Sequence, residues 1–397
     1  MRRLIGPAIA LVALLVAAGP ALAASWGQPS PITESHDAFP SYARSLAVVG
    51  DQVHLVDSRL SGQIEYRRST DGGAHWSAPI IIAQPDARFT SVLGDPAIAA
   101  RGSLVIVAYR AHDAAAAYLF IRRSADGGLT WGKPRRVARE VTDRRIGEQS
   151  VAISSAGVFV AWTDRVTGAI DLRRSTDGGR HFGATKRVGV TTYTFFPDNP
   201  AFTDGLIGLA AAGHNVYLAW SPSGNGPADS IVLSRSGDSG SSFHAPQTIF
   251  SAPTYGWPSL RAAGTFLVGQ FQAVDGTLQV VDSTDRGRHV SVTQLAEPTL
   301  GSIVGEGSVA LDAEGHALIS YGRSALPNGI DAPVGDVLVR SSHDGGRTWS
   351  ADETAAAGVT GLGNIGTALP ARGPLLVYAT CQDASSQICD VARVLRR

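Results

Sequence analysis

The sequence predicts an all-β protein in which a four-stranded unit is repeated around a ring. Three observations support this: a short turn pattern that recurs six times, an apolar strand pair that recurs seven times, and a composition of 45 glycines with 17% charged residues. With 44% hydrophobic residues, the chain of 397 residues can bury a large core. Glycine-rich, weakly charged chains of this kind make many turns, as all-β proteins do.

The N-terminus has the features of a secretory signal peptide over residues 1–24. Two arginines precede an apolar run over residues 4–18, and the small residues Ala21 and Ala23 mark a cleavage site. We therefore expect export to a secreted or periplasmic location and a mature single domain over residues 25–397. Retention of the segment as an uncleaved anchor is the alternative. No later segment has eighteen unbroken apolar residues, so no membrane span is expected in the mature form.

A short turn pattern, Ser-x-Asp-x-Gly followed three residues later by an aromatic residue, recurs through most of the chain. The copies are STDGGAHW from Ser69, SADGGLTW from Ser124, STDGGRHF from Ser175, SGDSGSSF from Ser236, SHDGGRTW from Ser342 and a degenerate STDRGRHV from Ser283. Internal repeats at such spacings indicate a repeat architecture.

Each turn has a structural explanation. An aspartate can accept hydrogen bonds from the N–H groups of its own turn, and a glycine two residues later can take positive φ without steric cost. The aromatic residue then enters the next strand and can pack between sheets. The aspartates are Asp71, Asp126, Asp177, Asp238, Asp285 and Asp344. We predict that they are structural.

A pair of apolar strands precedes each turn, and a seventh pair follows the last one. Runs rich in valine and alanine, joined by a polar or glycine-containing turn, are typical of β-hairpins. The pairs span residues 45–58, 97–110, 150–164, 208–221, 259–272, 308–322 and 367–380.

The two ends of the mature chain are expected to complete one sheet. Residues 25–32, SWGQPSPI, are similar to HWSAPIII at 75–82, which follows a turn as an outer strand. If residues 25–32 pair with residues 391–395, they close the ring and remove exposed sheet edges. The expected count is seven units, with six as the alternative.

The repeated turn resembles the Asp-box, or BNR repeat, of the sialidase superfamily of β-propellers, over nearly all of residues 25–397. The resemblance implies a seven-bladed β-propeller, or six-bladed in the alternative count. It does not fix an activity, because propellers with these turns include sialidases, xyloglucan-degrading endoglucanases, photosystem assembly factors and sorting receptors. In such propellers, ligands commonly bind on the face opposite the Asp-boxes.

Long irregular segments at 191–205, 221–230 and 323–336 fall on that opposite face, which favours a binding site there over tolerated insertions. The leading hypothesis is a module that binds an extracellular carbohydrate. Aromatic side chains would stack on sugar rings, and arginines would take acidic groups. The aromatic candidates are Tyr42, Trp220, Tyr255, Trp257 and Tyr321.

An exo-α-sialidase is the alternative from another class, and a protein-interaction scaffold is the third. The resemblance implies three arginines for the substrate carboxylate, an aspartate acid and a tyrosine nucleophile activated by a glutamate. Position and residue type offer Arg44, Arg59, Arg261 and Arg323, then Asp95, and Tyr321 or Tyr378 with Glu148 or Glu306. The family's Phe/Tyr-Arg-Ile-Pro signature is absent: Arg44, in FPSYARSL (39–46), is its only possible counterpart.

Other chemistries leave little trace in the sequence. The formal net charge is zero, without a basic stripe, which argues against a nucleic-acid partner. The histidines are dispersed, so we expect neither a metal site nor a cofactor. Cys381 and Cys389, close together near the C-terminus, predict one disulfide across a local hairpin in an oxidising compartment, with two free thiols as the alternative.

Overall fold

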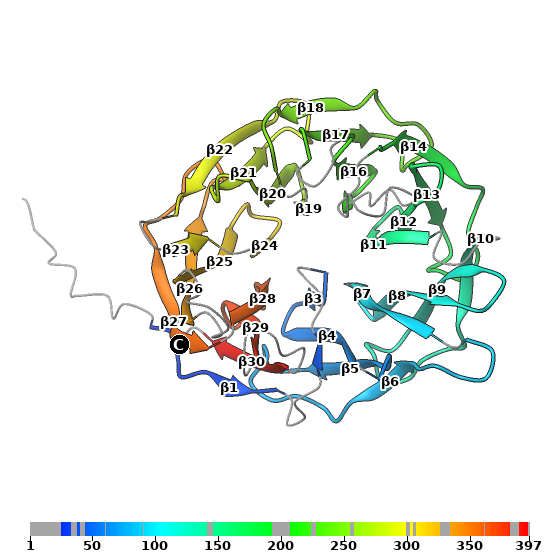
Figure 1. Ribbon diagram of the computed structural model, residues 1–397, viewed down its shortest axis with the longest axis horizontal. Coiled ribbons are helices and arrows are strands. Elements are labelled where there is room, and N and C mark those ends of the chain that lie inside the picture. The colour runs from blue at the N-terminus through cyan, green and yellow to red at the C-terminus, as the bar shows by residue number, and fades with distance from the viewer. Residues whose placement is uncertain are drawn as a thin grey trace, which may run out of the picture.

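The computed structural model arranges the chain as a ring of β-sheets around a central axis (Figure 1). It describes residues 25–32, 38–39, 44–59, 61–89, 91–140, 146–192, 207–223, 228–254, 258–298, 302–304, 307–325, 334–360, 362–381 and 389–395. These residues form strands, turns and irregular segments, and none of them is helical. The prediction of an all-β propeller is confirmed.

Five of the sheets come from consecutive strands and are numbered here in chain order. Sheet 2 contains β7 (Ser91–Arg101), β8 (Leu104–His112), β9 (Ala117–Ser124) and β10 (Arg135–Glu140). Sheet 3 contains β11 (Ile146–Ser154), β12 (Gly157–Asp164), β13 (Ala169–Ser175) and β14 (Lys186–Val190). Sheet 4 contains β15 (Ile207–Ala212), β16 (Asn215–Trp220), β17 (Ile231–Ser236) and β18 (Gln247–Phe250).

Sheet 5 contains β19 (Ser259–Ala263), β20 (Phe266–Gln272), β21 (Leu278–Ser283) and β22 (Ser291–Ala296). Sheet 6 contains β23 (Ser302–Val304), β24 (Ser308–Leu311), β25 (Ala317–Ala325), β26 (Val334–Ser342) and β27 (Glu353–Thr360), with β23 and β24 both paired to β25. In each of sheets 2 to 5 every strand is antiparallel to its neighbour, so the chain runs up and down across the sheet.

Sheet 1 combines the first and the last strands of the chain. Its first half contains β3 (Leu46–Val49), β4 (Gln52–Arg59), β5 (Ile64–Ser69) and β6 (Ile80–Ala83). Its last half contains β28 (Leu362–Ala368), β29 (Leu375–Cys381), β30 (Cys389–Leu395) and β1 (Ser30–Pro31). The short strand β2 (Ala38–Phe39) pairs with both β4 and β30 and joins the halves into nine strands.

The expected count of seven blades is therefore wrong, and the alternative count of six holds, with one blade for each hydrogen-bonded sheet. The sequence shows seven apolar pairs because all seven form antiparallel ladders, from β3–β4 to β28–β29. The pattern could not show that β2, only two residues long, links the first and last of these pairs in a single sheet.

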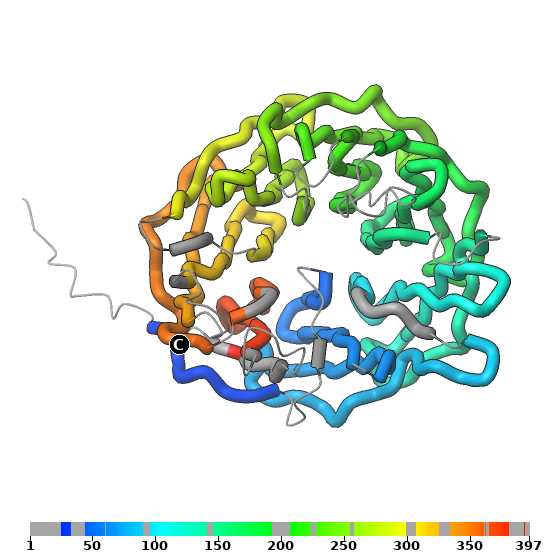
Figure 2. The backbone as a smooth tube through the Cα atoms, in the orientation of Figure 1, coloured from blue at the N-terminus to red at the C-terminus, as the bar shows by residue number. Residues whose placement is uncertain are grey.

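The first and last described strands of the chain, β1 and β30, lie side by side, as the blue and red segments of Figure 2 show. In β1, Ser30 is opposite Arg393 and Pro31 is opposite Ala392 of β30. On the other side of β30, Cys389 lies opposite Cys381 of β29 in the backbone register. The disulfide between these cysteines stays a prediction.

Hydrophobic clusters fill the spaces between neighbouring sheets. One cluster packs Ile121 and Ala108 of sheet 2 against Val151 and Trp162 of sheet 3. Another packs the two halves of sheet 1 against each other, with Leu55 of β4 close to Val377 and Leu375 of β29. Because each sheet buries both faces in this way, the core is a ring of interfaces around the axis.

The six Asp-box turns bond to their own backbone. Each aspartate accepts a hydrogen bond of 2.9–3.0 Å from the N–H group four residues later, and a further bond from the serine hydroxyl two residues earlier. The residue after the aspartate has positive φ in every copy. Two copies have no glycine there and place Ser239 and Arg286 at φ of 64° and 65°. The aspartates thus build turns and do not converge on a shared site.

Arginines next to these turns join neighbouring sheets. Arg68 of β5 donates to the Gly127 carbonyl at 3.2 Å, and Arg123 of β9 donates to the Gly178 carbonyl at 2.7 Å, both in the Asp-box turn of the following sheet. Arg173 of β13 instead donates to Val137 of the preceding sheet at 2.6 Å. The repeated Arg-Arg-Ser before the turn therefore has a structural use, because it connects adjacent sheets. In the described part of the chain, no helix could span a membrane.

Candidate functional site

The strand topology separates two faces of the ring. Asp-box turns connect third strands to fourth strands, and their backbones bond to the turns between first and second strands. Gly72 N–H donates to the Asp51 carbonyl at 2.9 Å, and Gly127 N–H donates to the Ser103 carbonyl at 2.8 Å. The starts of the first strands and the ends of the second strands must therefore lie on the opposite face, here called the upper face.

Innermost strands are irregular where they begin on the upper face. The register of β11 shifts between Ile146 and Gln149, which leaves Gly147 and Glu148 in a bulge. The register of β7 shifts between Leu93 and Ala97, around Asp95, and that of β28 shifts between Leu362 and Ile365. Bulges interrupt the ladder and redirect side chains, and they are common beside binding sites.

A sequence signal for these bulges exists, although the sequence analysis above missed it. Each contains glycine followed by a polar residue that can accept hydrogen bonds: Gly94-Asp95, Gly147-Glu148 and Gly363-Asn364. Each pair lies near the start of an innermost strand, just before its apolar run. Glycine in a strand pattern indicates a bulge or a close backbone approach. This second repeat therefore predicts polar side chains around one end of the axis.

Three arginines from different sheets approach Glu148, and we call these four residues the axial cluster. Arg44, just before β3, forms an ion pair with Glu148, and its Nη1 donates to the Gln149 carbonyl at 2.6 Å. Arg110, near the end of β8, donates to the Ile146 carbonyl at 3.5 Å. Arg165 follows β12 and lies so close to Gly147 that a Cβ there would be 3.0 Å from its Cγ.

The electrostatics of the axial cluster keep Glu148 ionised. Burial alone would raise the pKa of Glu148, but the positive charges of Arg44, Arg110 and Arg165 outweigh it and hold that pKa below its usual range. Arg110 and Glu148 are buried, and Arg165 is half-buried. Three guanidinium groups around one carboxylate form an arrangement that can take a further anionic group.

The candidates from the sequence fall in different places. Arg44 lies in the axial cluster with Glu148, and Asp95 lies in the bulge of β7. Arg59 belongs to a separate buried network, in which it pairs with Glu65 at 2.7 Å while Arg67 pairs with Glu65 at 3.1 Å.

Arg261, in β19, donates to the Leu260 carbonyl at 2.9 Å, and burial lowers its pKa to about 10. Four candidates lie outside the described residues: Tyr42, Tyr255, Trp257 and Glu306.

Tyr321 and Arg323 meet away from the axial cluster, around Asp352. The Tyr321 hydroxyl donates to Asp352, Arg340 Nε donates to the same carboxylate at 2.5 Å, and Arg323 lies 3.5 Å from it. The Tyr321 ring is buried in the core between sheets 5 and 6. Burial, and then the bond to Asp352, raise the pKa of Tyr321 to about 12. This hydroxyl is therefore held in its protonated form, as a structural donor.

Trp220 is a core residue. Only 1% of its surface is exposed, and its indole N–H donates to the Val190 carbonyl at 3.2 Å. Gly189 makes room for the ring, since a Cβ there would lie 2.4 Å from the indole. The side chain fills the interface between sheets 3 and 4 and leaves no face for a sugar ring.

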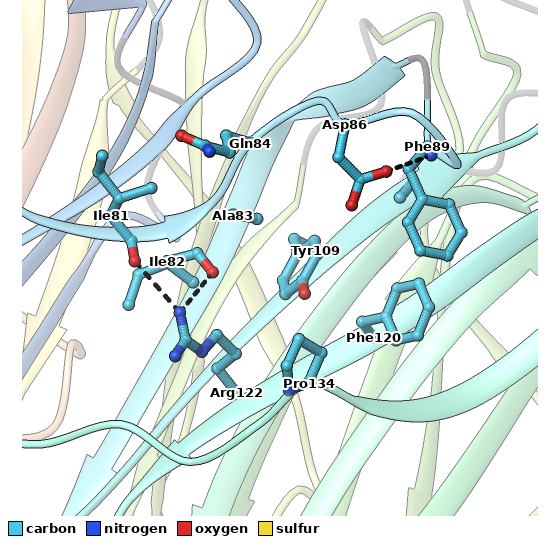
Figure 3. A pocket seen from close by; sticks show the side chains of 11 residues that line it. Ile81, Ile82, Ala83, Gln84, Asp86, Phe89, Tyr109, Phe120, Arg122 and Pro134 are labelled. Atoms are coloured by element: carbon cyan, nitrogen blue, oxygen red, sulfur yellow. Dashed lines mark hydrogen bonds between the residues drawn. The ribbon is translucent and has the colours of Figure 1, made fainter.

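A hollow of about 400 Å³ lies at the rim of the ring, between sheets 1 and 2 (Figure 3). We call it the rim pocket. Its aromatic wall contains Tyr109, Phe120 and Phe89, with Phe89 and Phe120 edge to face at 5.4 Å. Asp86 also lines it and accepts the Phe89 N–H at 2.6 Å, which contributes to a lowered pKa of Asp86. Aromatic walls with a few polar groups are typical of small-ligand sites.

Comparisons with known proteins give the family. The model of the BNR repeat-like domain matches residues 46–280, more than half of the chain. No curated protein sequence matches significantly.

Among solved structures, a PL25 polysaccharide lyase, an ulvan lyase bound to -[GlcA(1-4)Rha3S]-, is similar with a TM-score of 0.56 and 8% identity over 92% of this chain and 95% of that chain. The NanB sialidase from Streptococcus pneumoniae gives a TM-score of 0.48 and 12% identity over 92% and 69% of the two chains. The Hadza microbial sialidase Hz136 gives 0.44 and 14% over 85% and 74%. The ulvan lyase likeness shows the fold. Together with the six Asp-box turns and the family match, the fold leads to one conclusion: the chain belongs to the BNR repeat-like domain family of the sialidase superfamily of β-propellers.

Proposed function

We propose that this protein binds an acidic carbohydrate outside the cell through the axial cluster on its upper face. The observation that carries the proposal is the approach of Arg44, Arg110 and Arg165 to the single carboxylate of Glu148. Guanidinium groups bind carboxylate and sulfate oxygens through paired, charge-assisted hydrogen bonds, which makes an acidic sugar a better fit than a neutral one.

The fold supports carbohydrate as the ligand class to test first. The similar ulvan lyase structure holds a ligand of glucuronic acid and sulfated rhamnose. A uronic acid or a sulfated sugar presents the planar or tetrahedral anion that an arginine cluster can grip.

We propose binding without sialidase chemistry because the groups for that chemistry are engaged elsewhere. Tyr321, the nucleophile candidate, is a buried donor to Asp352 with a pKa of about 12. Tyr378, the other candidate, also has a pKa raised to about 12, by burial. Glu148, a candidate to activate the tyrosine, is paired with Arg44, and its lowered pKa makes it a weak base for that role.

Two further parts of the proposal concern the chain termini. Residues 1–24 act as the signal peptide that exports the protein, and the mature domain begins near Ala24. We also propose that β1 closes the ring, because its pairing gives β30 an outer partner and covers a strand edge that could otherwise pair with other molecules. Export would place the axial cluster in contact with extracellular polysaccharides.

Calorimetric titration with a glucuronic acid oligosaccharide and with a neutral glucose oligosaccharide tests the proposal. We expect binding of the acidic probe only, and about tenfold or more weaker binding in Arg165→Gln, since a charge-assisted hydrogen bond contributes about 1.5–3 kcal/mol. Glu148→Gln removes the competing carboxylate and is expected to bind the acidic probe more tightly. Arg101→Gln, an exposed arginine at a first-to-second strand turn, is the matched control.

Three results would contradict the proposal. Equal losses in Arg165→Gln and Arg101→Gln would mean that overall charge, and not the axial cluster, drives binding. Release of a fluorophore from a sialoside, abolished in Tyr321→Phe, would establish the sialidase alternative. Absence of both binding and turnover, with a protein partner that co-purifies, would establish the scaffold alternative.

A further inference from the structure

A second hollow at the rim, of about 420 Å³, is strongly basic. It is lined by Arg123, Gly132, Lys133, Pro134, Arg135 and Arg180, and we call it the basic hollow. Four of these six residues carry positive charge and none is acidic, although the chain as a whole has a formal net charge of zero. Arg180 belongs to the Asp-box turn of sheet 3, so the basic hollow lies on the face opposite the axial cluster.

The cations of the basic hollow are held by neutral acceptors. Arg123 donates to the Gly178 carbonyl at 2.7 Å, Arg135 to the Arg180 carbonyl at 3.1 Å, and Arg180 to the Asp177 carbonyl at 3.0 Å. Backbone carbonyls orient guanidinium groups but leave their charge uncompensated. The side chains of Lys133, Arg135 and Arg180 are exposed, so their remaining N–H groups can reach a ligand.

Like charges in the basic hollow disfavour one another. Burial and then the charges of Arg180 and Arg135 lower the pKa of Arg123, and the attraction of Asp177 is a smaller effect. Asp177 is already committed to its own turn, where it accepts the N–H groups of Arg180 and His181 and pairs with the His181 ring at 2.6 Å. An anion bound between these cations would relieve their repulsion.

The neighbouring rim pocket indicates what kind of anion fits. Pro134 lines both hollows, and the Gly132 carbonyl, on the same link, accepts a bond from Arg122 of the rim pocket at 2.9 Å. The rim pocket offers the aromatic rings of Tyr109 and Phe120 and the carboxylate of Asp86. Sugar hydroxyls can donate to that carboxylate, whereas a phosphodiester backbone would be repelled by it. A chain with both neutral rings and anionic groups therefore suits the pair of hollows.

We propose that the basic hollow binds the sulfate groups of a sulfated polysaccharide, with a neighbouring sugar ring of the same chain in the rim pocket. This site is separate from the axial cluster, and it would let one long polysaccharide contact two faces of the ring. It could hold the protein on a polymer independently of the upper face, because local concentration rises when two sites engage one chain.

The test uses dextran sulfate oligosaccharides, unmodified dextran and single-stranded DNA as probes, in full-length mature protein that carries Arg165→Gln to weaken the axial cluster. We expect the double variant Lys133→Gln, Arg180→Gln to bind dextran sulfate at least tenfold more weakly, with a weaker dependence on salt. Unmodified dextran should bind more weakly than dextran sulfate by a similar factor. Single-stranded DNA, with comparable charge, should bind more weakly than dextran sulfate.

A matched control removes the same charges elsewhere. Arg288 holds the same Asp-box position in sheet 5 as Arg180 in sheet 3, and Lys186 is an exposed lysine of β14. The double variant Lys186→Gln, Arg288→Gln is expected to keep its affinity for dextran sulfate. Equal losses of affinity for dextran sulfate in both double variants would overturn the proposal. So would single-stranded DNA that binds as tightly as dextran sulfate and loses as much affinity in the Lys133→Gln, Arg180→Gln variant. Thermal unfolding confirms that the variants fold. The single variant Arg180→Gln, which is expected to bind dextran sulfate several-fold more weakly, gives an independent measurement.

Discussion

Gly128 lies directly against the hydroxyl group of Tyr66, so closely that a Cβ at Gly128 would be 1.8 Å from the Tyr66 oxygen. Tyr66 is in β5 of sheet 1, whereas Gly128 is in the Asp-box turn of sheet 2. The same hydroxyl lies 2.7 Å from His54 Nδ1, and the Trp131 ring packs edge-on to Tyr66 at 4.8 Å. The second glycine of this Asp-box thus serves the contact between sheets as well as the turn.

Substitution Gly128→Ala should separate that contact from backbone strain. Gly102 also has positive φ, but a Cβ there would meet no atom within 4 Å. Both alanine variants suffer the strain of positive φ, and only Gly128→Ala also forces Tyr66 to move. We expect Gly128→Ala to lower the free energy of unfolding by about 1–3 kcal/mol more than Gly102→Ala in urea titrations. Equal losses would show that the interface adjusts without cost.

The Asp-box carboxylates should make the fold sensitive to acid. Burial opposes ionisation of Asp344, but bonds from Thr348 and Ser342 prevail and lower its pKa to about 2; the other five have lowered pKa values as well. Their stabilising contribution is complete above the pKa of unfolded aspartate and is lost as pH falls through the folded values. We expect the melting temperature to drop steeply below about pH 4.

Replacement Asp126→Asn removes one of these carboxylates and should weaken that acid dependence while it lowers the melting temperature at pH 7. The control is Glu314→Gln, an exposed acid in a turn of sheet 6. If the pH profile of Asp126→Asn matches that of the unmodified protein, the Asp-box bonds contribute nothing to acid sensitivity.

Asp282 should have the opposite pH dependence. It is buried in β21, and burial raises its pKa to about 6, with Arg347 opposing and Asp344 adding to the shift. Because the folded pKa exceeds the unfolded value, its contribution to stability is present below about pH 4 and is lost as pH rises through 6. Asp282→Asn should raise the free energy of unfolding by on the order of 2 kcal/mol at pH 8 and leave it unchanged at pH 4. A gain of the same size at both pH values would count against ionisation as the cause.

Tyr321→Phe should affect stability and not ligand binding. The change removes a hydrogen bond to the ionised Asp352, a loss of about 1–3 kcal/mol. We expect Tyr321→Phe to lower the urea midpoint and to leave the affinity for the glucuronic acid probe unchanged. Arg165→Gln should instead lower that affinity and leave the urea midpoint unchanged. Unchanged stability together with lost affinity or turnover would place Tyr321 in the functional site.

The ring of repeated sheets could be predicted from the sequence because the Asp-box and the apolar pair each encode a local structure. Asp71 and Gly73 determine their turn within a few residues. The axial cluster could not be predicted in the same way. Arg44, Arg110 and Glu148 come from three sheets, and only the packing of those sheets brings them together.

Tyr321 and Trp220 were wrongly predicted as site residues for a related reason. Trp220 is the last residue of β16, whereas Tyr321 lies in the middle of β25 and not at the end of a second strand as the sequence suggests. Neither residue type nor position in the sequence tells which side of the strand faces the neighbouring sheet. In both cases the ring fills a core between sheets. The bulge that redirects Glu148 shifts this alternation by one residue, an effect that a strict period of two does not include.

Removal of residues 25–32 tests whether β1 closes the ring. A chain that begins at Thr33 lacks β1, and β30 then keeps β29 but loses its outer partner. We expect a lower melting temperature and a greater tendency to aggregate than in a chain that begins at Ser25, since an open strand edge can pair with other molecules. Identical melting curves and equal solubility would show that β1 adds nothing to closure.

The pairing of β1 with β30 also determines when this protein can finish folding. β1 leaves the ribosome long before β30, so no nascent chain can complete that sheet until β30 has been synthesised. Sheets 2 to 5 each draw on consecutive strands and can form in order, but the joint between the halves of sheet 1 has to wait. If this pairing closes the ring, as proposed, the arc of sheets stays open until β30 has been made, and closure is a single late event.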